Sequence, residues 1–405
     1  MDVTYRAVRR DEIAAFRAAI LRVFGMDWPA SDDEDERYVS LLPPERTLAA
    51  FDGSSIVGTS GTFGVEMSIP GSSIPVAALT MVTVAHTHRR RGILRTMMQH
   101  HVESAESRGD LLSVLWASEA AIYGRFGYGI AAEHDAATVE ARGLDIPLGH
   151  GADALRMVDG PERELVCEVY ESARRQRAGM LGRSATWWSE RHFRDPEFRR
   201  RGASARRYVV AERGDAITGY LAYRQRPKME GGIADGEVQV DELIALDAQS
   251  AATLWRHATR IDLHPRLSVW SLPVDGELPW LVDDRRKVRT VRADAVWVRI
   301  CDVPGAMTAR TYDHDGRVTF CVVDPMHRVD GTYALEVQEG RASCRRVDAP
   351  AEVELGLNVL GTLYLGGFRA WSLAHAGALR APHDVIARLD RLFATRRAPW
   401  CAEIF

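Results

Sequence analysis

The chain has 405 residues, of which 46% are hydrophobic and 27% are charged, and its formal net charge at pH 7 is −4. These values are typical of a folded globular protein, and the length suffices for two or three domains. The slightly acidic balance gives no global electrostatic support for a nucleic-acid partner.

No stretch approaches the ~20 apolar residues that a membrane helix needs. The charged amino-terminal residues do not fit a signal peptide. The five cysteines are scattered without a C-x-x-C pair, which indicates free thiols and neither a disulfide framework nor a zinc site; they are Cys167, Cys301, Cys321, Cys344 and Cys401. We therefore expect a cytoplasmic protein with no membrane or nucleic-acid partner and no bound metal.

The chain begins with a predicted strand, residues 3–8, and a helix that buries Ile13, Phe16, Ile20 and Phe24. An acidic stretch, residues 31–36, follows shortly after Asp27 and Trp28. Such a stretch fits a solvated loop or an acid-rich helix start. It also fits a surface that attracts a polycationic amine to an acceptor site. The sequence leaves both interpretations open.

Two hairpins are predicted next, turning at Asp52-Gly53 and around Gly71. Their strands are expected over residues 48–51 and 55–64, and then over 65–70 and 73–79. The second hairpin runs into an apolar stretch, Leu79–Val84, that predicts a buried strand.

A turn with three arginines and a glycine, Arg89-Arg90-Arg91-Gly92, follows this strand. Residues 93–108 after it have the periodicity of an amphipathic helix. The start of a helix offers unpaired N–H groups, glycine lets an anion approach the backbone closely, and arginines raise the positive potential. A basic turn alone is usually only solvated. Placed between a strand and a helix, this one favours a diphosphate site.

Two strings in this region resemble one family. R-x-x-G-x-L at residues 89–94, after V-T-V at 82–84, resembles the acetyl-CoA-binding Q/R-x-x-G-x-G/A motif of the GNAT N-acetyltransferases, with Leu94 in place of a small residue. Y-G-R-F-G-Y at residues 123–128, after a predicted strand over 111–116, resembles their Y-x-x-x-G-F signature. The longer strings around both motifs are similar to one branch, the Eis (enhanced intracellular survival) acetyltransferases.

The resemblance implies acetyl-CoA as co-substrate, with no metal. Its diphosphate would lie at the turn and the helix start, on Arg90, Arg91, Gly92, Ile93, Leu94 and Arg95. Its pantetheine amides would pair with the preceding strand, at Val82, Thr83 and Val84. Ser118 and Glu119 also match the Eis coenzyme site.

Tyr123 falls where this family carries the general acid that protonates the leaving thiolate. A phenol with a pKa near ~10 suits a thiolate whose pKa is near ~8.5. Without the motif, a tyrosine that only packs would be the favoured interpretation. Tyr128 takes a position usually filled by a packing phenylalanine.

A general base is harder to find, because the histidines at 86, 88, 100 and 101 fit a turn and a helix face better than a site. The resemblance implies that the α-carboxylate of Phe405, at the end of the chain, reaches the first domain's site as the base. The alternative is that the terminus frays. The apolar character of Trp400, Cys401, Ile404 and Phe405 argues against fraying.

The middle of the chain repeats the order of the first part: a hairpin over residues 207–224, an apolar strand over 237–246 and a helix over 249–261. A helix over 161–178 precedes them. Asp247-Ala-Gln-Ser-Ala-Ala stands where the arginine turn stood before. This part therefore resembles a second GNAT-like domain that has lost its coenzyme site, and we expect it to bind no diphosphate.

From about residue 291 the pattern is that of a small α+β domain. Strands are predicted over 297–300, 317–323 and 331–337, and a final helix begins at Pro382. This part resembles the sterol-carrier-protein-like domain of Eis proteins. The predicted fold class is thus mixed α/β and α+β, with GNAT-like domains over 1–147 and 148–290 and the third domain over 291–405.

The sequence thus predicts an acetyl-CoA-dependent N-acetyltransferase. By resemblance its acceptors are polycationic amines such as aminoglycosides, modified at several positions, and its assembly is a hexamer. One alternative is a protein-lysine N-acetyltransferase. The other is a non-catalytic lipid- or ligand-binding protein with a degenerate first domain, against which the intact arginine turn and Tyr123 argue.

Overall fold

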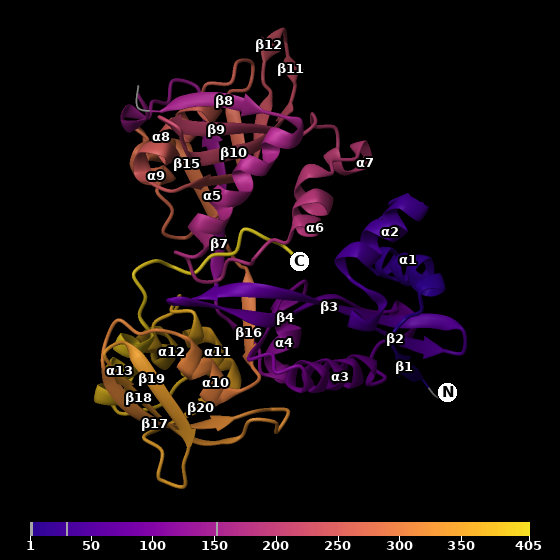
Figure 1. Cartoon of the computed structure of the whole chain (residues 1–405), viewed down its shortest axis with the longest axis vertical. Helices are drawn as coiled ribbons and strands as arrows, with labels where there is room; N and C mark the ends of the chain where they lie inside the picture. Colours follow the sequence, from indigo (N-terminus) through magenta and orange to yellow (C-terminus); the bar gives the residue numbers. More distant parts are fainter. Residues whose placement is uncertain (1–2, 30, 151–152) are drawn as a thin grey trace. The chain divides into compact units, whose positions relative to one another are not determined.

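A computed structural model describes residues 3–29, 31–150 and 153–405 (Figure 1). The chain forms two compact units. Unit 1 comprises Met1–Ala132, Ala295–Arg396 and Glu403–Phe405, and unit 2 comprises Glu133–Asp294 and Arg397–Ala402. Neither unit is continuous along the chain, unlike the three predicted domains. No helix in the described part is both long enough and apolar enough to cross a bilayer.

The first sheet of unit 1 has the strand order β1-β2-β3-β4-β5-β16-β6. Its strands are β1 (Thr4–Arg6), β2 (Thr47–Asp52), β3 (Ser55–Ile69), β4 (Ser72–Val84), β5 (Leu112–Trp116), β6 (Gly129–Ile130) and β16 (Val296–Ile300). The helices beside it are α1 (Ile13–Phe24), α2 (Asp32–Leu41), α3 (Ile93–Ser107) and α4 (Ala120–Tyr123). The strands β1 to β4 form an antiparallel meander, whereas β4 and β5 pair in parallel.

The predicted turns at Gly53 and Gly71 are confirmed, because both glycines lie between paired strands at positive φ. The predicted break after residue 64 is wrong. Residues 55–69 form one strand because β4 pairs with them on both sides of this point, as Gly64 with Ala77 and Val65 with Val76.

Helix α1 buries Ile13, Phe16 and Ile20 as predicted. Phe24 is instead 42% exposed, since it is the last residue of the helix before Gly25 turns the chain away at φ 64°. The acidic stretch begins helix α2, where the Ser31 side chain accepts a hydrogen bond from the Glu34 N–H. This is the acid-rich helix start that the sequence had left open.

The second sheet of unit 1 has the order β19-β18-β17-β20. Its strands are β17 (Gly316–Val323), β18 (Gly331–Gln338), β19 (Arg341–Arg346) and β20 (Val353–Gly356), and its helices are α10 (Val303–Ala309), α11 (Leu357–Tyr364), α12 (Ala370–His375) and α13 (His383–Phe393). The strands predicted over 317–323 and 331–337 and the final helix are confirmed. Strand β19, with the sequence RASCRR, was not predicted because it lacks an apolar alternation.

The strand predicted over 297–300 lies in the first sheet as β16, and not in the third domain's sheet. It pairs with β5 on one side and β6 on the other. All five residues of β16 are buried. The apolar pattern predicts the strand itself, but it carries no information about which sheet receives it.

Unit 2 contains a sheet with the order β15-β7-β14-β13-β10-β9-β8. Its strands are β7 (Glu133–Glu140), β8 (Ala154–Val158), β9 (Arg207–Arg213), β10 (Ala216–Arg226), β13 (Glu237–Ala245), β14 (Arg266–Leu272) and β15 (Val288–Asp294). A short hairpin, β11 (Met229–Glu230) with β12 (Ile233–Ala234), stands apart from it. The helices are α5 (Leu165–Arg174), α6 (Ala185–Trp187), α7 (Glu197–Arg200), α8 (Ala248–Thr259) and α9 (Leu278–Leu281). The helix predicted over 161–178 is thus a 3₁₀ turn, Gly160–Glu164, followed by α5.

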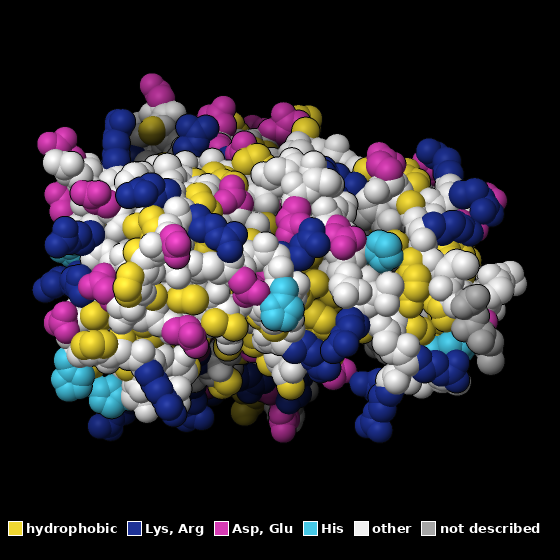
Figure 2. All heavy atoms as spheres, turned by 90° about the horizontal axis from the view of Figure 1, so that it is seen from below, with side chains coloured by type: hydrophobic (Ala, Val, Ile, Leu, Met, Phe, Trp, Pro, Cys, Tyr) yellow, Lys and Arg dark blue, Asp and Glu magenta, His cyan; other side chains and the backbone are white. Residues whose placement is uncertain are grey.

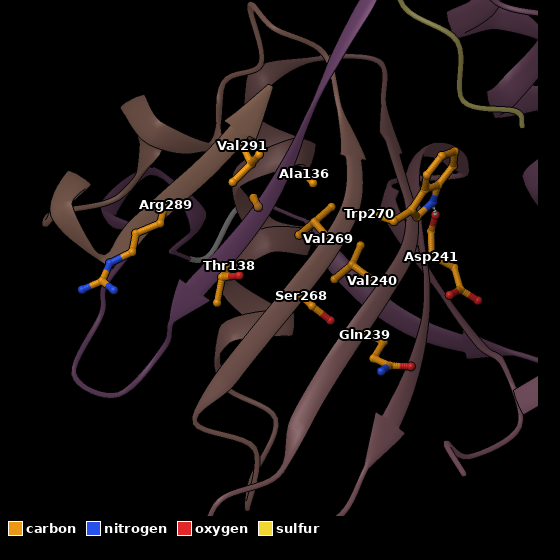
Figure 3. A pocket seen from close by; sticks show the side chains of 11 residues that line it. Ala136, Thr138, Gln239, Val240, Asp241, Ser268, Val269, Trp270, Arg289 and Val291 are labelled. Atoms are coloured by element: carbon orange, nitrogen blue, oxygen red, sulfur yellow. Dashed lines mark hydrogen bonds between the residues drawn. The ribbon is translucent and has the colours of Figure 1, made fainter. Parts of the chain in front are cut away.

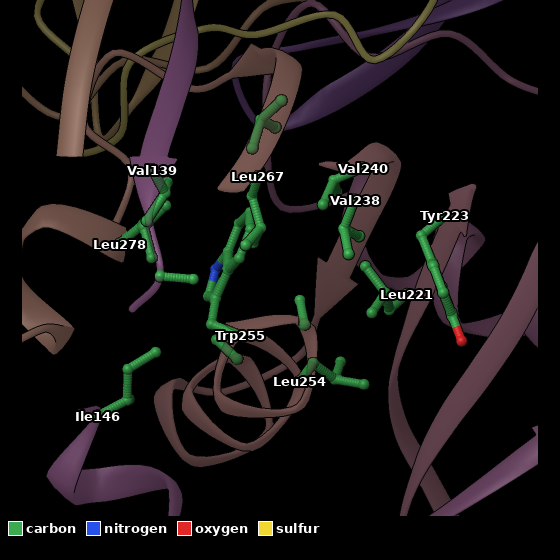
Figure 4. Packing of buried hydrophobic residues seen from close by; sticks show 14 of the residues in the cluster. Val139, Ile146, Leu221, Tyr223, Val238, Val240, Leu254, Trp255, Leu267 and Leu278 are labelled. Atoms are coloured by element: carbon green, nitrogen blue, oxygen red, sulfur yellow. The ribbon is translucent and has the colours of Figure 1, made fainter. Parts of the chain in front are cut away.

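Helices cover both faces of this sheet. Trp255 and Leu254 of α8 pack against Val238, Val240 and Leu267 on one face (Figure 4). On the other face Tyr170 of α5 packs in a cluster with residues of β9 and β10, including Tyr208 and Tyr220. Alternate residues of each strand therefore point into different cores, as the period of two requires.

Candidate active site

Strands β4 and β5 pair along only part of their length. They are hydrogen-bonded from Ala77 to Leu79, opposite Ser113 to Leu115. Beyond Leu79, β4 continues to Val84 with β3 on its other side. From Thr80 to Val84, therefore, no described strand pairs with the β4 edge that faces β5. An extended chain of amides can add to such an edge as one more strand.

A β-bulge shapes this open segment. Two residues of β4 oppose one residue of β3 there, and Met81 adopts a left-handed φ of 56°. The Thr59 hydroxyl holds the bulge, because it donates to the Met81 carbonyl at 2.8 Å and lies 2.6 Å from the Thr83 hydroxyl. Tyr38 of α2 contacts the Met81 sulfur with its hydroxyl. No sequence pattern points to Thr59, because its role depends on a partner strand.

The arginine turn follows β4 as predicted. Gly92 is the N-cap of α3 at φ 81°, and no side chain caps the helix. The N–H groups of Ile93, Leu94 and Arg95 in the first turn are thus available to an anion, with the positive end of the helix dipole behind them. The side chains of Arg90 and Arg91 are exposed. We call residues 90–95 the anion cradle, because free N–H groups and arginines are what a diphosphate would need there.

The corresponding helix of unit 2 begins differently. Its N-cap is Asp247, whose carboxylate accepts hydrogen bonds from the Ser250 N–H at 2.9 Å and from Arg213 at 3.0 Å. Hydrogen bonds from Arg213, and then from the Ser250 N–H, lower the pKa of Asp247 to about 2. An ionised carboxylate thus occupies the start of α8 where an anion would bind. This supports the expectation that the second domain binds no diphosphate there.

Tyr123 ends helix α4 with its side chain 4% exposed. Its ring packs edge-on against Tyr128, with 6.0 Å between centroids. Among the described residues its hydroxyl has no hydrogen-bond partner, whereas the Tyr128 hydroxyl lies 2.7 Å from the Ser113 hydroxyl. Burial raises the pKa of Tyr123 to about 12, and the nearby charge of Glu119 adds to this. Tyr123 is thus protonated throughout the physiological pH range.

The predicted parts meet in one hydrophobic cluster. Tyr123 packs there with Leu79 and Val82 of β4, and Leu94 of α3 lies against the same cluster. Leu94, which departs from the family's small residue, is thus a partly buried member of this packing. The open strand edge, the anion cradle and the buried phenol are thereby brought together.

Ser118 and Glu119 lie between β5 and α4, and both are exposed. Glu119 is 3.8 Å from the Arg89 guanidinium. An exposed ion pair of this kind contributes little to stability. It does, however, show that the turn after β5 lies beside the arginine turn.

A buried polar chain supports the cluster from behind. His101 of α3 lies 3.0 Å from the Thr62 hydroxyl through Nδ1 and 2.7 Å from the Ser113 hydroxyl through Nε2. Burial lowers the pKa of His101 to about 3. His101 was predicted to lie on a helix face, and the structure shows that this face is buried. It is a neutral structural residue that fixes Ser113 and, through it, Tyr128.

The carboxyl-terminal segment is anchored. The Trp400 N–H donates to the Ala178 carbonyl and its Nε1 donates to the Ser271 hydroxyl, both at 2.9 Å. Glu403–Phe405 belong to unit 1, the unit that contains Tyr123. Phe405 is half-buried, and its α-carboxylate has no ion pair with a described residue. Ile404, predicted to pack, is 58% exposed.

Family models match three parts of the chain. A GNAT acetyltransferase domain matches residues 4–131, a second GNAT acetyltransferase domain matches 179–300, and a sterol carrier protein domain matches 303–402. The predicted fold, two GNAT domains followed by a sterol-carrier-protein-like domain, is therefore confirmed.

Relatives and solved structures agree with these matches. An uncharacterized N-acetyltransferase of Streptomyces coelicolor is 36% identical over 410 residues, 99% of either chain. The N-acetyltransferase Eis of Mycobacterium tuberculosis is 35% identical over 369 residues, 88% of either chain. The crystal structure of Eis1 from Mycobacterium abscessus superimposes over the full length of both chains with a TM-score of 0.84 at 28% identity. A GCN5-related N-acetyltransferase from Anabaena variabilis has a TM-score of 0.87 at 18% identity, which shows the common fold. The chain therefore belongs to the Eis family of GNAT N-acetyltransferases.

Proposed function

We propose that this N-acetyltransferase moves the acetyl group of acetyl-CoA to amines of polycationic acceptors such as aminoglycosides, at more than one amine of each acceptor. The observation that carries the proposal is the packing of Tyr123 in one cluster with Val82 of the open strand edge and Leu94 of the anion cradle. A thioester that ended at this cluster would have a proton donor beside it.

Acetyl-CoA supplies the activated acetyl group. Backbone N–H groups of residues 92–95 and the guanidinium groups of Arg90 and Arg91 would bind its diphosphate. The edge from Val82 to Val84 would pair with the pantetheine amides, and an N–H there would polarise the thioester carbonyl. Ser118 and Glu119 would border the coenzyme at the turn after β5.

Tyr123 would protonate the leaving thiolate. With a pKa of about 12 the phenol is always in its acid form at neutral pH. Full transfer to a thiolate of ordinary pKa is uphill by roughly 3 to 4 pK units, about 5 kcal/mol. A hydrogen bond from the hydroxyl to the developing thiolate lowers this cost, because a charge-assisted hydrogen bond is stronger in a dry site. Tyr123 therefore acts first as a hydrogen-bond donor and then as an acid.

The α-carboxylate of Phe405 would accept a proton from the acceptor's ammonium group, so that the neutral amine can attack the thioester carbonyl. Two features of the chain end support this role. Hydrogen bonds hold Ala398 and Trp400 shortly before the chain end, and the carboxylate of Phe405 is not neutralised by an ion pair with a described residue.

The acceptor would lie beside α2. The contact between Tyr38 and Met81 places this helix next to the bulge where the thioester would be. Arginines pair with Asp35 and Glu36, whereas the exposed carboxylates of Asp27 and Asp32 have no ion pair with a described residue. Acidic and basic side chains are interspersed over the face shown in Figure 2, which carries no broad patch of one sign.

A thiol-release assay with acetyl-CoA tests the proposal. We expect turnover with several aminoglycosides and transfer of more than one acetyl group to each, measured by mass spectrometry. Release with lysine peptides alone would indicate a protein-lysine N-acetyltransferase. Coenzyme binding without thiol release from any amine would indicate a non-catalytic binding protein.

By resemblance we also infer a hexameric, cytoplasmic enzyme. All five cysteines are thiols, which suits a reducing compartment. Sedimentation velocity of the full chain tests the assembly, since a hexamer has six times the mass of the 45.1 kDa chain. A monomer at micromolar concentration would contradict this inference.

A further inference from the structure

Unit 2 contains a cavity of about 420 Å³ whose lining is dominated by arginine. Eight arginines, from Arg191 to Arg226, line it together with Gln239 and two aspartates, Asp195 and Asp241. We call it the arginine cavity. Its lining thus carries six more positive than negative charges, although the formal net charge of the whole chain is −4. Neither the acetyl-transfer site nor the predicted motifs account for it.

The two aspartates hold part of this lining in place. Asp195 accepts hydrogen bonds from Arg224 at 2.7 Å, and Asp241 accepts from Arg206 at 2.6 Å and from Arg224 at 3.1 Å. Arg200 is 3.3 Å from Asp195. Two carboxylates are thus shared among three arginines, which fixes the guanidinium groups but leaves their charge incompletely neutralised.

Two further arginines of the lining have no carboxylate partner among the described residues. Arg226 donates only to the Arg201 carbonyl, at 2.9 Å, and the Arg201 side chain has no partner. Arg201 also adopts a left-handed φ of 50°, ahead of Gly202 at φ 83°. This conformation costs about 1 kcal/mol for a residue with a Cβ. Like charges held close together in a cavity repel one another unless an anion joins them.

The arginine cavity is not the remnant of a coenzyme site. A coenzyme site in this domain would lie at the start of α8, where Arg213 binds Asp247 near the turn of the β9–β10 hairpin. Arg206 and Arg224 stand at the opposite end of that hairpin, where Tyr223 of β10 pairs with Arg207 of β9. The two positions are at different ends of the same sheet.

A hollow on the sheet face adjoins the cavity. Gln239 and Asp241 line both, and the hollow, of about 620 Å³, also contains the side chains of Trp270 and Val291 (Figure 3). The Trp270 indole donates to the Asp241 carbonyl at 2.6 Å, which holds its ring beside the cavity. Val291 is 71% exposed. An anion with an attached ring system would therefore find an aromatic surface next to the arginines.

We propose that the arginine cavity binds a small anion with two or more linked phosphate groups. Guanidinium groups match phosphate oxygens with paired hydrogen bonds, and several of them converging from η7 (Trp188–Phe193), α7, the residue before β9 and β10 suit more than one phosphate. The volume lies in the range of small-molecule sites. A nucleic acid fits less well, because the arginines converge in a concave cavity and do not form a stripe across the surface.

Calorimetric titration of the full chain with sodium triphosphate and with ATP tests this. Arg201→Asn removes one guanidinium and keeps a residue that tolerates the left-handed conformation. Arg226→Gln removes another. We expect each to weaken binding about tenfold, the loss of one charge-assisted interaction. Arg207→Gln, an exposed arginine outside the lining, is the matched control and should change the affinity less than about twofold. Unchanged melting temperatures show that the variants fold.

Further titrations show whether the ligand is a nucleotide or a free polyphosphate, and whether it binds in the arginine cavity or at the coenzyme turn. If ATP binds more tightly than triphosphate, its adenine ring also contacts the protein, in the hollow. If the two affinities are equal, only the phosphate groups are recognised. Arg91→Gln should weaken phosphate binding at the coenzyme turn only, and should leave intact the binding that Arg201→Asn and Arg226→Gln weaken. The proposal is overturned by no binding of either ligand, by wild-type affinity in Arg201→Asn and Arg226→Gln, or by loss of binding in Arg91→Gln. The proposal would also be overturned if citrate bound as tightly as triphosphate. It would likewise be overturned if a DNA oligomer bound more tightly than triphosphate and Arg207→Gln weakened that binding as much as Arg201→Asn and Arg226→Gln do.

Discussion

Arg299 and Asp324 form an ion pair in which neither side chain is exposed to solvent. The guanidinium donates two hydrogen bonds to the carboxylate, at 2.9 and 2.7 Å. It also donates to the Phe126 carbonyl at 2.7 Å. Gly127 makes this approach possible, because a Cβ at that position would lie 2.3 Å from the guanidinium. This one pair thus joins three segments: a strand of the first sheet, a loop of the sterol carrier domain and the segment after Tyr123.

Asp324→Asn should therefore destabilise the protein strongly. Removing the carboxylate leaves Arg299 buried without a counter-charge, which typically costs about 3 kcal/mol or more of unfolding free energy. Urea unfolding measures the loss. Glu106→Gln is the matched control, since Glu106 pairs with Arg328 in the same region but at the surface. It should cost less than about 1 kcal/mol. Equal effects of the two substitutions would contradict a special role for the buried pair.

Tyr123→Phe should lower kcat about 100-fold and leave the affinity for acetyl-CoA unchanged, because the hydroxyl acts on the leaving thiolate and not on the bound coenzyme. Steady-state kinetics and calorimetry measure the two quantities. Tyr128→Phe is the control, because that hydroxyl is bonded to Ser113. It should cost about 1 kcal/mol of stability with little change in kcat. An unchanged kcat in Tyr123→Phe would refute the assignment.

The pH profile of kcat offers a second test of Tyr123. A phenol whose pKa is raised to about 12 by burial stays protonated, and competent as an acid, at every pH below that value. We therefore expect no decrease of kcat between pH 8 and pH 10 that depends on Tyr123. The measurement compares the wild type with Tyr123→Phe over this interval. A decrease near pH 9 that is present only in the wild type would show that the phenol titrates there.

Extending the chain beyond Phe405 should reduce turnover. One added glycine moves the terminal carboxylate by a residue and converts the present one into an amide, so the base would be displaced. We expect kcat to fall at least about tenfold, with acetyl-CoA binding retained. A glycine added at the amino terminus instead is the control. Full activity of the extended chain would exclude the terminal carboxylate as the base.

His101 should make the protein less stable in mild acid. Its pKa is lowered to about 3 by burial, so the folded state binds no proton there, whereas an unfolded histidine is protonated below about pH 6.5. Stability is thus lost as the pH falls from 6.5 towards 3, by about 2 kcal/mol at pH 5.

The variant His101→Gln tests this contribution. It should be less stable than the wild type at pH 7.5, and the difference should shrink at pH 5. Urea unfolding at the two pH values measures both. His100→Gln, on the exposed side of the same helix, should leave the pH dependence unchanged. A pH dependence that persists in His101→Gln would assign it to other groups.

Local patterns were enough to predict the parts of the site that depend on neighbours in the sequence. Gly92 after three arginines predicts an uncapped helix start because glycine allows the positive φ found there. Tyr123 is predicted by its motif and is found at the end of α4. These features require only a few adjacent residues, and their geometry is set by backbone sterics and by the free N–H groups of a helix start.

Only the tertiary structure decided what these parts contact. Thr59 holds the Met81 bulge across two strands, β16 inserts between β5 and β6, and Arg299 reaches Phe126 over a separation of 173 residues. The eight arginines of the arginine cavity likewise come from different elements of unit 2. By itself the sequence predicted the strand that ends at Val84, the arginine turn before a helix and the motif that contains Tyr123. Pairing of distant strands and burial of charged partners depend on long-range packing, which the periodicity of a single segment does not contain.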